Sequence, residues 1–214
     1  DQSGRYNLKK ERKQQSKKLI TRTKLFPLSG NKELESTISV SRIGKIKTSK
    51  GKMVTSILPE ISQFRVWYEK KEHFSQLKIN RKTRQLEVLS KSPDNSYKGK
   101  TLFNLPPAKY YCFFSQFEEC VKEQNLLVLA ARKKVQVFVI WDNFPYHSEQ
   151  YEGLGPEPFV NAIFALDKHD KKNLKYSLDI GSQVIFYQFD KKLRLSGMYW
   201  VTQGISAVSV DKEF

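Results

Sequence analysis

The sequence predicts a mainly β protein with one principal helix and a basic N-terminal arm. Three observations favour this class. Aromatic residues make up 13% of the chain and short runs of Val and Ile recur, a mix that is typical of strands. Apolar and polar residues alternate over most of the chain, and one segment alone shows helical spacing. Lys and Arg number 38 against 22 Asp and Glu, which gives a net charge of +16.

The arm is residues 1–24, and residues 25–214 are expected to form a single β-rich domain. The arm carries +7, because nine cations face only Asp1 and Glu11, and it has too few apolar residues to bury itself. It is interpreted either as a flexible tail that lies on phosphates or as a nuclear-localisation tract. The cations are Arg5, Lys9, Lys10, Arg12, Lys13, Lys17, Lys18, Arg22 and Lys24.

Two hairpins with basic tips are predicted in the first half of the domain. Residues 37–58 alternate on either side of a turn at 49–51, and residues 76–79 and 85–89 flank a second tip. A loop with Pro93-Asp94-Asn95 as turn residues is expected over 90–105. The outward cations of the first hairpin are Arg42, Lys45, Lys47, Lys50 and Lys52, and those of the second tip are Arg81, Lys82 and Arg84.

Between these hairpins, residues 63–70 (QFRVWYEK) alternate cleanly. Phe64 and Val66 share one face, which should point into the core, so Arg65 and Trp67 must share the other. We predict that Trp67 is a platform on which a base stacks and that Arg65 contacts phosphate. The alternative is that an insertion from 71–105 folds over Trp67.

The principal helix is predicted over 106–124, since Pro is tolerated in a first turn and apolar residues recur there at three and four. Residues 126–131 and 134–141 are predicted as two strands around a basic turn, followed by a loop at 143–158 and further hairpins to residue 210. The basic turn is Arg132-Lys133-Lys134, and the last hairpins carry Arg194 close to Tyr199 and Trp200.

The charge points to a polyanionic partner, because a net charge this large repels itself in the compact state. Nucleic acid is the commonest such partner and an anionic membrane surface is the second. No apolar run reaches the roughly 18 residues of a membrane-spanning helix, and we expect no membrane partner. Cations and rings are interleaved, as in single-strand binders, where each stacked base contributes roughly 1–3 kcal/mol. We therefore expect single-stranded DNA or RNA to bind the cations and rings named above.

No catalytic or cofactor motif is found, and we expect neither an enzyme nor a cofactor. Gly153-Leu154-Gly155-Pro156 is flanked by acids, which repel phosphate, and is interpreted as a loop. Cys112 and Cys120 lie eight apart, which is no zinc spacing, and are expected to be reduced core thiols of an intracellular protein, nuclear or in another DNA-containing compartment.

The order of elements, with strands on both sides of one helix, resembles the OB-fold, a small Greek-key barrel that binds oligonucleotides on one face. The segment from Ile180 to Val210 is similar to the closing strands of single-stranded-DNA-binding proteins, in which a basic, aromatic hairpin precedes a strand of small residues. The resemblance covers residues 37–211 and implies an OB-like barrel and single-strand binding in replication, recombination, repair or telomere work. The alternatives are a basic subunit of a ribonucleoprotein or replication complex, with protein partners, and a metal-dependent nuclease.

Overall fold

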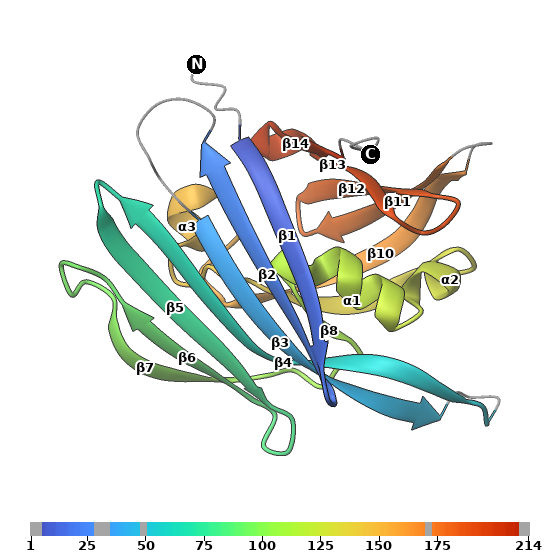
Figure 1. Cartoon of the computed structure of the whole chain (residues 1–214), viewed down its shortest axis with the longest axis horizontal. Helices are drawn as coiled ribbons and strands as arrows, with labels where there is room; N and C mark the ends of the chain where they lie inside the picture. The colour runs from blue at the N-terminus through green and yellow to red at the C-terminus, as the bar shows by residue number, and fades with distance from the viewer. Residues whose placement is uncertain (1–5, 28–34, 48–50, 170–172, 210–214) are drawn as a thin grey trace.

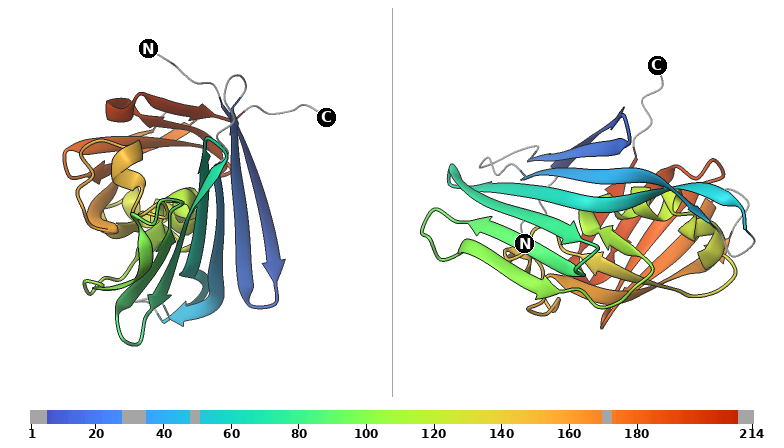
Figure 2. Two further views of the ribbon diagram at one scale, coloured as in Figure 1. Left: turned by 90° about the vertical axis from the view of Figure 1, so that its left-hand side faces the viewer. Right: turned by 90° about the horizontal axis from the view of Figure 1, so that it is seen from below.

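The computed structural model describes residues 6–27, 35–47, 51–169 and 173–209. It has fourteen strands in two seven-stranded sheets, so the mainly β prediction is confirmed (Figure 1). In both sheets the strand order follows the chain, so each strand pairs with the strands before and after it in sequence. The Greek-key topology expected from the sequence would instead pair strands that are further apart in the chain. Figure 2 shows the two sheets as separate layers with the helices between them.

Sheet A contains strands β1 to β7, all antiparallel. Its inner face points toward the helices and sheet B, and its outer face points away from them. The strands are β1 (Tyr6–Gln15), β2 (Lys18–Pro27), β3 (Glu35–Lys47), β4 (Met53–Tyr68), β5 (Lys71–Asn80), β6 (Gln85–Lys91) and β7 (Lys98–Asn104).

Sheet B contains strands β8 to β14, of which β8 and β9 are parallel and the rest antiparallel. Its strands are β8 (Tyr111–Phe113), β9 (Val135–Ile140), β10 (Phe159–His169), β11 (Asn173–Ile180), β12 (Gln183–Asp190), β13 (Leu195–Trp200) and β14 (Ile205–Val208). The helices are η1 (Phe114–Gln116), α1 (Phe117–Glu123), α2 (Leu126–Ala130), α3 (His147–Gln150) and η2 (Val201–Gln203). Within the described ranges, no helix is long and apolar enough to cross a membrane.

The predicted arm is corrected by the structure, since most of it is a regular hairpin. Strands β1 and β2 pair from Tyr6 with Pro27 to Gln15 with Lys18. The inward side chains of β1 bind acids of α1: Lys10 forms an ion pair with Glu118, and Arg12 lies 3.2 Å from Glu119. These partners are more than one hundred residues away in sequence, so local composition could not indicate them.

The helical region is also shorter than predicted. Residues 111–113 form β8, which pairs with residues 138–140 of β9, and α1 begins only at Phe117. Residues 126–130, predicted as a strand, form α2. The apolar residues that recur at three and four are core, since Phe113, Phe117 and Val121 are fully buried.

The cysteine prediction is wrong, because Cys112 and Cys120 form a disulfide. The chain reverses direction between β8 and α1, and this brings the two Cα atoms to 5.8 Å, a normal distance for a disulfide. The bond therefore ties α1 to the first strand of sheet B.

The main core lies between sheet B and the helices. It contains the inward residues of β9 to β13 together with Phe117 and Val121 of α1 and Leu126 and Leu127 of α2. A second cluster joins β5 and β6 of sheet A to the other side of β8 and β9. Sheet A is thus attached to the main core at β8 and β9 and through α1.

Candidate nucleic-acid interface

The outer face of sheet A is a broad basic surface, which we call the basic face. Residues that alternate with its outward side chains are buried, for example Phe64, Leu77 and Val88. Strand register then places eleven cations on the basic face against four acids. The cations are Lys9, Lys13, Lys18, Arg22, Lys24, Arg42, Arg65, Lys78, Lys91, Lys98 and Lys100; the acids are Glu11, Glu60, Glu72 and Glu87.

Each of the four acids lies in an ion pair with a cation of the same face. The nitrogen–oxygen distances are 3.2 Å for Lys9 with Glu11, 3.1 Å for Arg42 with Glu60, 3.3 Å for Arg65 with Glu72 and 2.8 Å for Lys100 with Glu87. The eleven cations and four acids therefore give the basic face a net charge of +7.

One row of the basic face crosses all seven strands. Register aligns, in order, Lys9, Lys24, Ser36, Arg65, Phe74, Lys91 and Lys98. Because adjacent strands lie about 4.8 Å apart, the row spans roughly 29 Å. It places five cations and one ring along a continuous track.

Trp67 and Arg65 lie on the basic face, as the alternation predicts. Both are half-buried, while Phe64 and Val66 are buried on the opposite side. Residues 71–104 do not fold over Trp67 as an insertion but form the next three strands of the same sheet. The Arg65 guanidinium lies 4.8 Å from the centre of the Phe74 ring, so a phosphate would bind an arginine already held in place.

The two predicted basic tips are hairpin turns of sheet A, one between β3 and β4 and the other between β5 and β6. Arg81, Lys82 and Arg84 lie in the β5–β6 turn, and the first two line a pocket together with Arg42 of β3. Lys45 and Lys52 are exposed on the β3–β4 hairpin, which extends past the rest of the sheet (Figure 1). Lys50 and the side chain of Lys47 lie outside the described residues.

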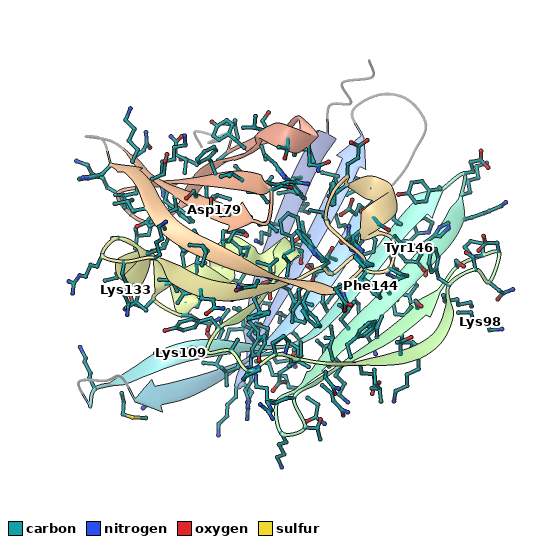
Figure 3. The ribbon with its side chains drawn as sticks, turned by 180° about the vertical axis from the view of Figure 1, so that it is seen from behind. Lys98, Lys109, Lys133, Phe144, Tyr146 and Asp179 are labelled. Carbon is teal, nitrogen blue, oxygen red and sulfur yellow. A yellow bond between two sulfur atoms is a disulfide. The ribbon has the colours of Figure 1, made fainter. Side chains whose placement is uncertain are left out.

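The remaining predicted residues belong to sheet B and its connections. Arg132, Lys133 and Lys134 form the turn before β9, and Figure 3 shows Lys133 and Lys98 at opposite ends of the molecule. Arg194 binds Asp190 at 2.7 Å in the β12–β13 turn, and Tyr199 is half-buried on β13. The structure therefore does not join them to the basic face.

Trp200 is a correction, because it is core and not a stacking surface. Its side chain is 1% exposed, and its indole Nε1 donates a hydrogen bond of 2.8 Å to Gln183. It lies parallel to Trp141, with ring centres 6.3 Å apart. No base can reach a ring in this position.

Sequence reasoning missed much of the basic face. The cations of β1 and β2 were assigned to a tail, and Lys78, Lys91 and Lys98 were not singled out. Alternation over 71–80 (KEHFSQLKIN) was the available signal, since it places Phe74 and Lys78 opposite Leu77. What the sequence could not supply is which strands are neighbours.

A second notable feature, a buried carboxylate among hydroxyl groups, lies against the inner face of sheet A. Asp142 follows β9 and accepts a hydrogen bond of 2.7 Å from the backbone N–H of Ser115 and another from the Ser62 hydroxyl. Burial raises the pKa of Asp142 to about 6. Burial, together with the charge of Asp142, raises the pKa of Glu35 to about 7. Both groups are positioned to respond to pH near neutrality.

No protein-family model matches, and no curated protein matches. A solved structure that resembles it is described as a β-barrel-like protein of domain of unknown function DUF1849 from Brucella abortus. The TM-score is 0.48 at 10% identity, over 94% of this chain and 83% of that one.

The resemblance to OB-fold single-stranded-DNA-binding proteins is wrong. The two seven-stranded sheets follow the chain order, where the resemblance implied a single small Greek-key barrel. The similarity rested on basic and aromatic hairpins, which occur in this fold as well.

Proposed function

We propose that this protein is a non-catalytic binder of single-stranded nucleic acid and that the basic face is its binding surface. The observation that carries the proposal is the row from Lys9 to Lys98, which aligns five cations and Phe74 across the sheet. Cations along a track bind successive phosphates, and exposed rings accept bases. The proposal does not depend on the OB-fold.

The test compares two variants with equal loss of charge. One changes Lys24, Lys91 and Lys98 to Gln on the basic face, and the control changes Arg132, Lys133 and Lys134 to Gln beside sheet B. Binding to fluorescent single-stranded DNA, single-stranded RNA and duplex is measured at two or more salt concentrations. Each lost phosphate contact should reduce the salt slope by about 0.7 on single strands, so the first variant should lose about 2 and the control none.

Trp67→Ala tests the ring. If a base stacks on the indole, affinity should fall by about 1–3 kcal/mol while the variant stays folded. Equal salt slopes for the two triple variants would contradict the proposal. It would also be contradicted if a folded Trp67→Ala protein kept its affinity and the basic-face triple variant kept the salt slope of the unaltered protein.

An anionic lipid surface is the second candidate, and two observations favour it. Disulfides persist mainly in oxidising compartments, where free nucleic acid is not the usual polyanion. Leu89 and Leu102, on the same face, are 40% and 55% exposed among lysines, and apolar side chains with cations suit a lipid interface. Co-sedimentation with phosphatidylserine vesicles, but not with neutral vesicles, would support this candidate.

The compartment can be tested separately. The disulfide favours an oxidising compartment over the intracellular location that the sequence analysis expects. Alkylation of free thiols in freshly lysed cells, followed by mass spectrometry, should leave Cys112 and Cys120 unmodified if the bond is formed in the cell.

A further inference from the structure

A pocket of about 330 Å³ opens where the basic face meets the β5–β6 turn. It lies beside the irregularity in β3–β4 pairing at Val40 and Ser41, which leaves Glu60 as an extra residue in β4. Its volume is at the lower end of the roughly 300–1,000 Å³ of ligand sites. The lining residues are Arg42, Glu60, Ile61, Lys78, Ile79, Asn80, Arg81 and Lys82.

Arg81 and the turn that carries Lys82 are held by contacts already formed. The Arg81 guanidinium donates to the Pro59 carbonyl oxygen at 3.3 Å and lies 5.6 Å from the centre of the Tyr111 ring. Asn80 Oδ1 accepts the backbone N–H groups of Lys82 and Thr83, at 3.1 and 3.2 Å, which fixes the turn. Binding an anion here would therefore order few additional groups.

Arg81 also lines the pocket with a partly buried guanidinium. Its Nε is buried and has no hydrogen-bond partner among the residues that the structure describes, so an anion in the pocket would bind the terminal nitrogens of the guanidinium. Arginine suits this task because its planar donors match phosphate oxygens.

The charge of the pocket selects the kind of anion. Four cations face one acid, so the lining carries a net +3. A phosphodiester within a strand carries one negative charge, whereas a phosphate monoester carries about −1.5 to −2 at pH 7.

We propose that this pocket binds a phosphate monoester, the terminal phosphate of the strand that the basic face holds. The inference rests on the proposed function for the identity of the strand, but the phosphate site itself can be tested alone. It assigns Arg42, Lys78, Arg81 and Lys82 to one site, and three of these four were expected as binding residues from sequence.

The experiment uses the full chain and two probes. Inorganic phosphate is titrated by calorimetry, and eight-nucleotide thymidine strands are compared with a terminal phosphate or a terminal hydroxyl at matched salt. The variants are Lys78→Gln and Arg81→Gln, with Lys133→Gln as the control of equal charge away from the pocket. Lys78 is exposed, so its variant should stay folded even if loss of the Tyr111 contact destabilises the Arg81 variant.

We expect the phosphorylated strand to bind about tenfold more tightly than the hydroxyl strand, and Lys78→Gln but not Lys133→Gln to abolish the difference. The preference should increase between pH 5.5 and 7.5, as the monoester, with a second pKa near 6, gains its second charge. Equal binding of the two strands, with no measurable binding of inorganic phosphate, would overturn the inference and leave the proposed function standing. Binding of phosphate without binding of either strand would leave the pocket standing and reject the proposed function.

Discussion

The inner faces of the two sheets are covered by different chemistry. Sheet B presents apolar side chains to α1 and α2, and rings such as Phe164 and Tyr187 pack on Phe117 with centres 5.4 and 5.0 Å apart. Strands β2 to β4 of sheet A present hydroxyl groups as well as apolar side chains such as Phe64 and Val66. Register aligns Thr21, Ser39 and Ser62 in one row, and all three are buried.

The difference shows that the sheets are stabilised in different ways. Apolar burial contributes about 25 cal/mol per Å² and does not depend on direction. Buried hydroxyls contribute little net free energy once their lost hydration is counted, and their hydrogen bonds must be aligned. We therefore expect sheet B and its helices to dominate the free energy of unfolding, and strands β1 to β3 to open first.

The largest expected effect is from Phe117→Ala. Phe117 is fully buried between α1 and sheet B, and replacing a buried Phe with Ala costs about 3–5 kcal/mol. Phe74→Ala is the matched control, since Phe74 is half-exposed on the outer face of sheet A, and it should cost less than about 1.5 kcal/mol. Urea unfolding measures both. Similar losses would show that the sheet B core is not dominant.

The next effect is from removal of the disulfide. Closing a loop of this length stabilises a protein by about 2–3 kcal/mol in the chain-entropy account. The variant with both Cys112 and Cys120 changed to Ala should lose this amount, and reductant should destabilise the unaltered protein but not the variant. Fluorescence of Trp141 and Trp200, both in the main core, reports the transition. If reductant also destabilised the variant, the loss in stability would have a cause other than this bond.

Asp142→Asn tests the polar side of the comparison through pH. The folded-state pKa of Asp142, about 6, exceeds its ordinary 3.8. The folded state therefore binds the proton more tightly, so this group's contribution is fully present below about pH 4 and is lost as pH rises to 6. The stability difference between variant and unaltered protein should shift by on the order of 2 kcal/mol across that window.

The control for this prediction is Glu35→Gln. The folded-state pKa of Glu35 is about 7, so its contribution should be lost over a window that extends about one pH unit higher. Unfolding by urea at pH 4, 5, 6 and 7 distinguishes the two variants. A constant difference from pH 4 to 7 for Asp142→Asn would mean that the carboxylate is not desolvated in solution.

The smallest effect is expected from Ser39→Ala. The Ser39 hydroxyl lies 3.4 Å from the hydroxyls of both Ser62 and Ser115, which is long for a hydrogen bond between oxygens. The loss in free energy of unfolding should be below about 1 kcal/mol. A loss of 3 kcal/mol, equal to that at Phe117, would show that the hydroxyl rows stabilise sheet A as strongly as rings stabilise sheet B.

The parts of the fold that sequence predicted are those with strong local periodicity. Alternation over 63–70 gave both the strand and the correct inner side for Phe64 and Val66. The turn around Pro93-Asp94-Asn95 is also present, with Asp94 accepting hydrogen bonds from Ser92 and Ser96, although residues 98–104 of the predicted loop form β7. Such features depend on neighbours within a few residues, which the sequence displays directly.

The parts that failed depend on distant partners. Local composition predicts a solvated tail for the charged residues of β1, because the acids that they bind lie on α1. Spacing likewise predicts free thiols for Cys112 and Cys120, because the reversal of the chain between β8 and α1 brings them together. The candidate site was affected in the same way. Arg42, Arg65 and Trp67 were identified singly, but joining them to Lys24 and Lys98 requires the strand order.

The two end strands of sheet A have a consequence for assembly. Among the described residues, sheet A ends at β1 and β7, and such edge strands have backbone groups that can pair with another chain. Both strands carry lysines, including Lys9 and Lys13 at one end and Lys98 and Lys100 at the other. Two copies approaching edge to edge would bring like charges together. The lysines of the proposed binding surface should thus also oppose the edge pairing through which exposed strands aggregate.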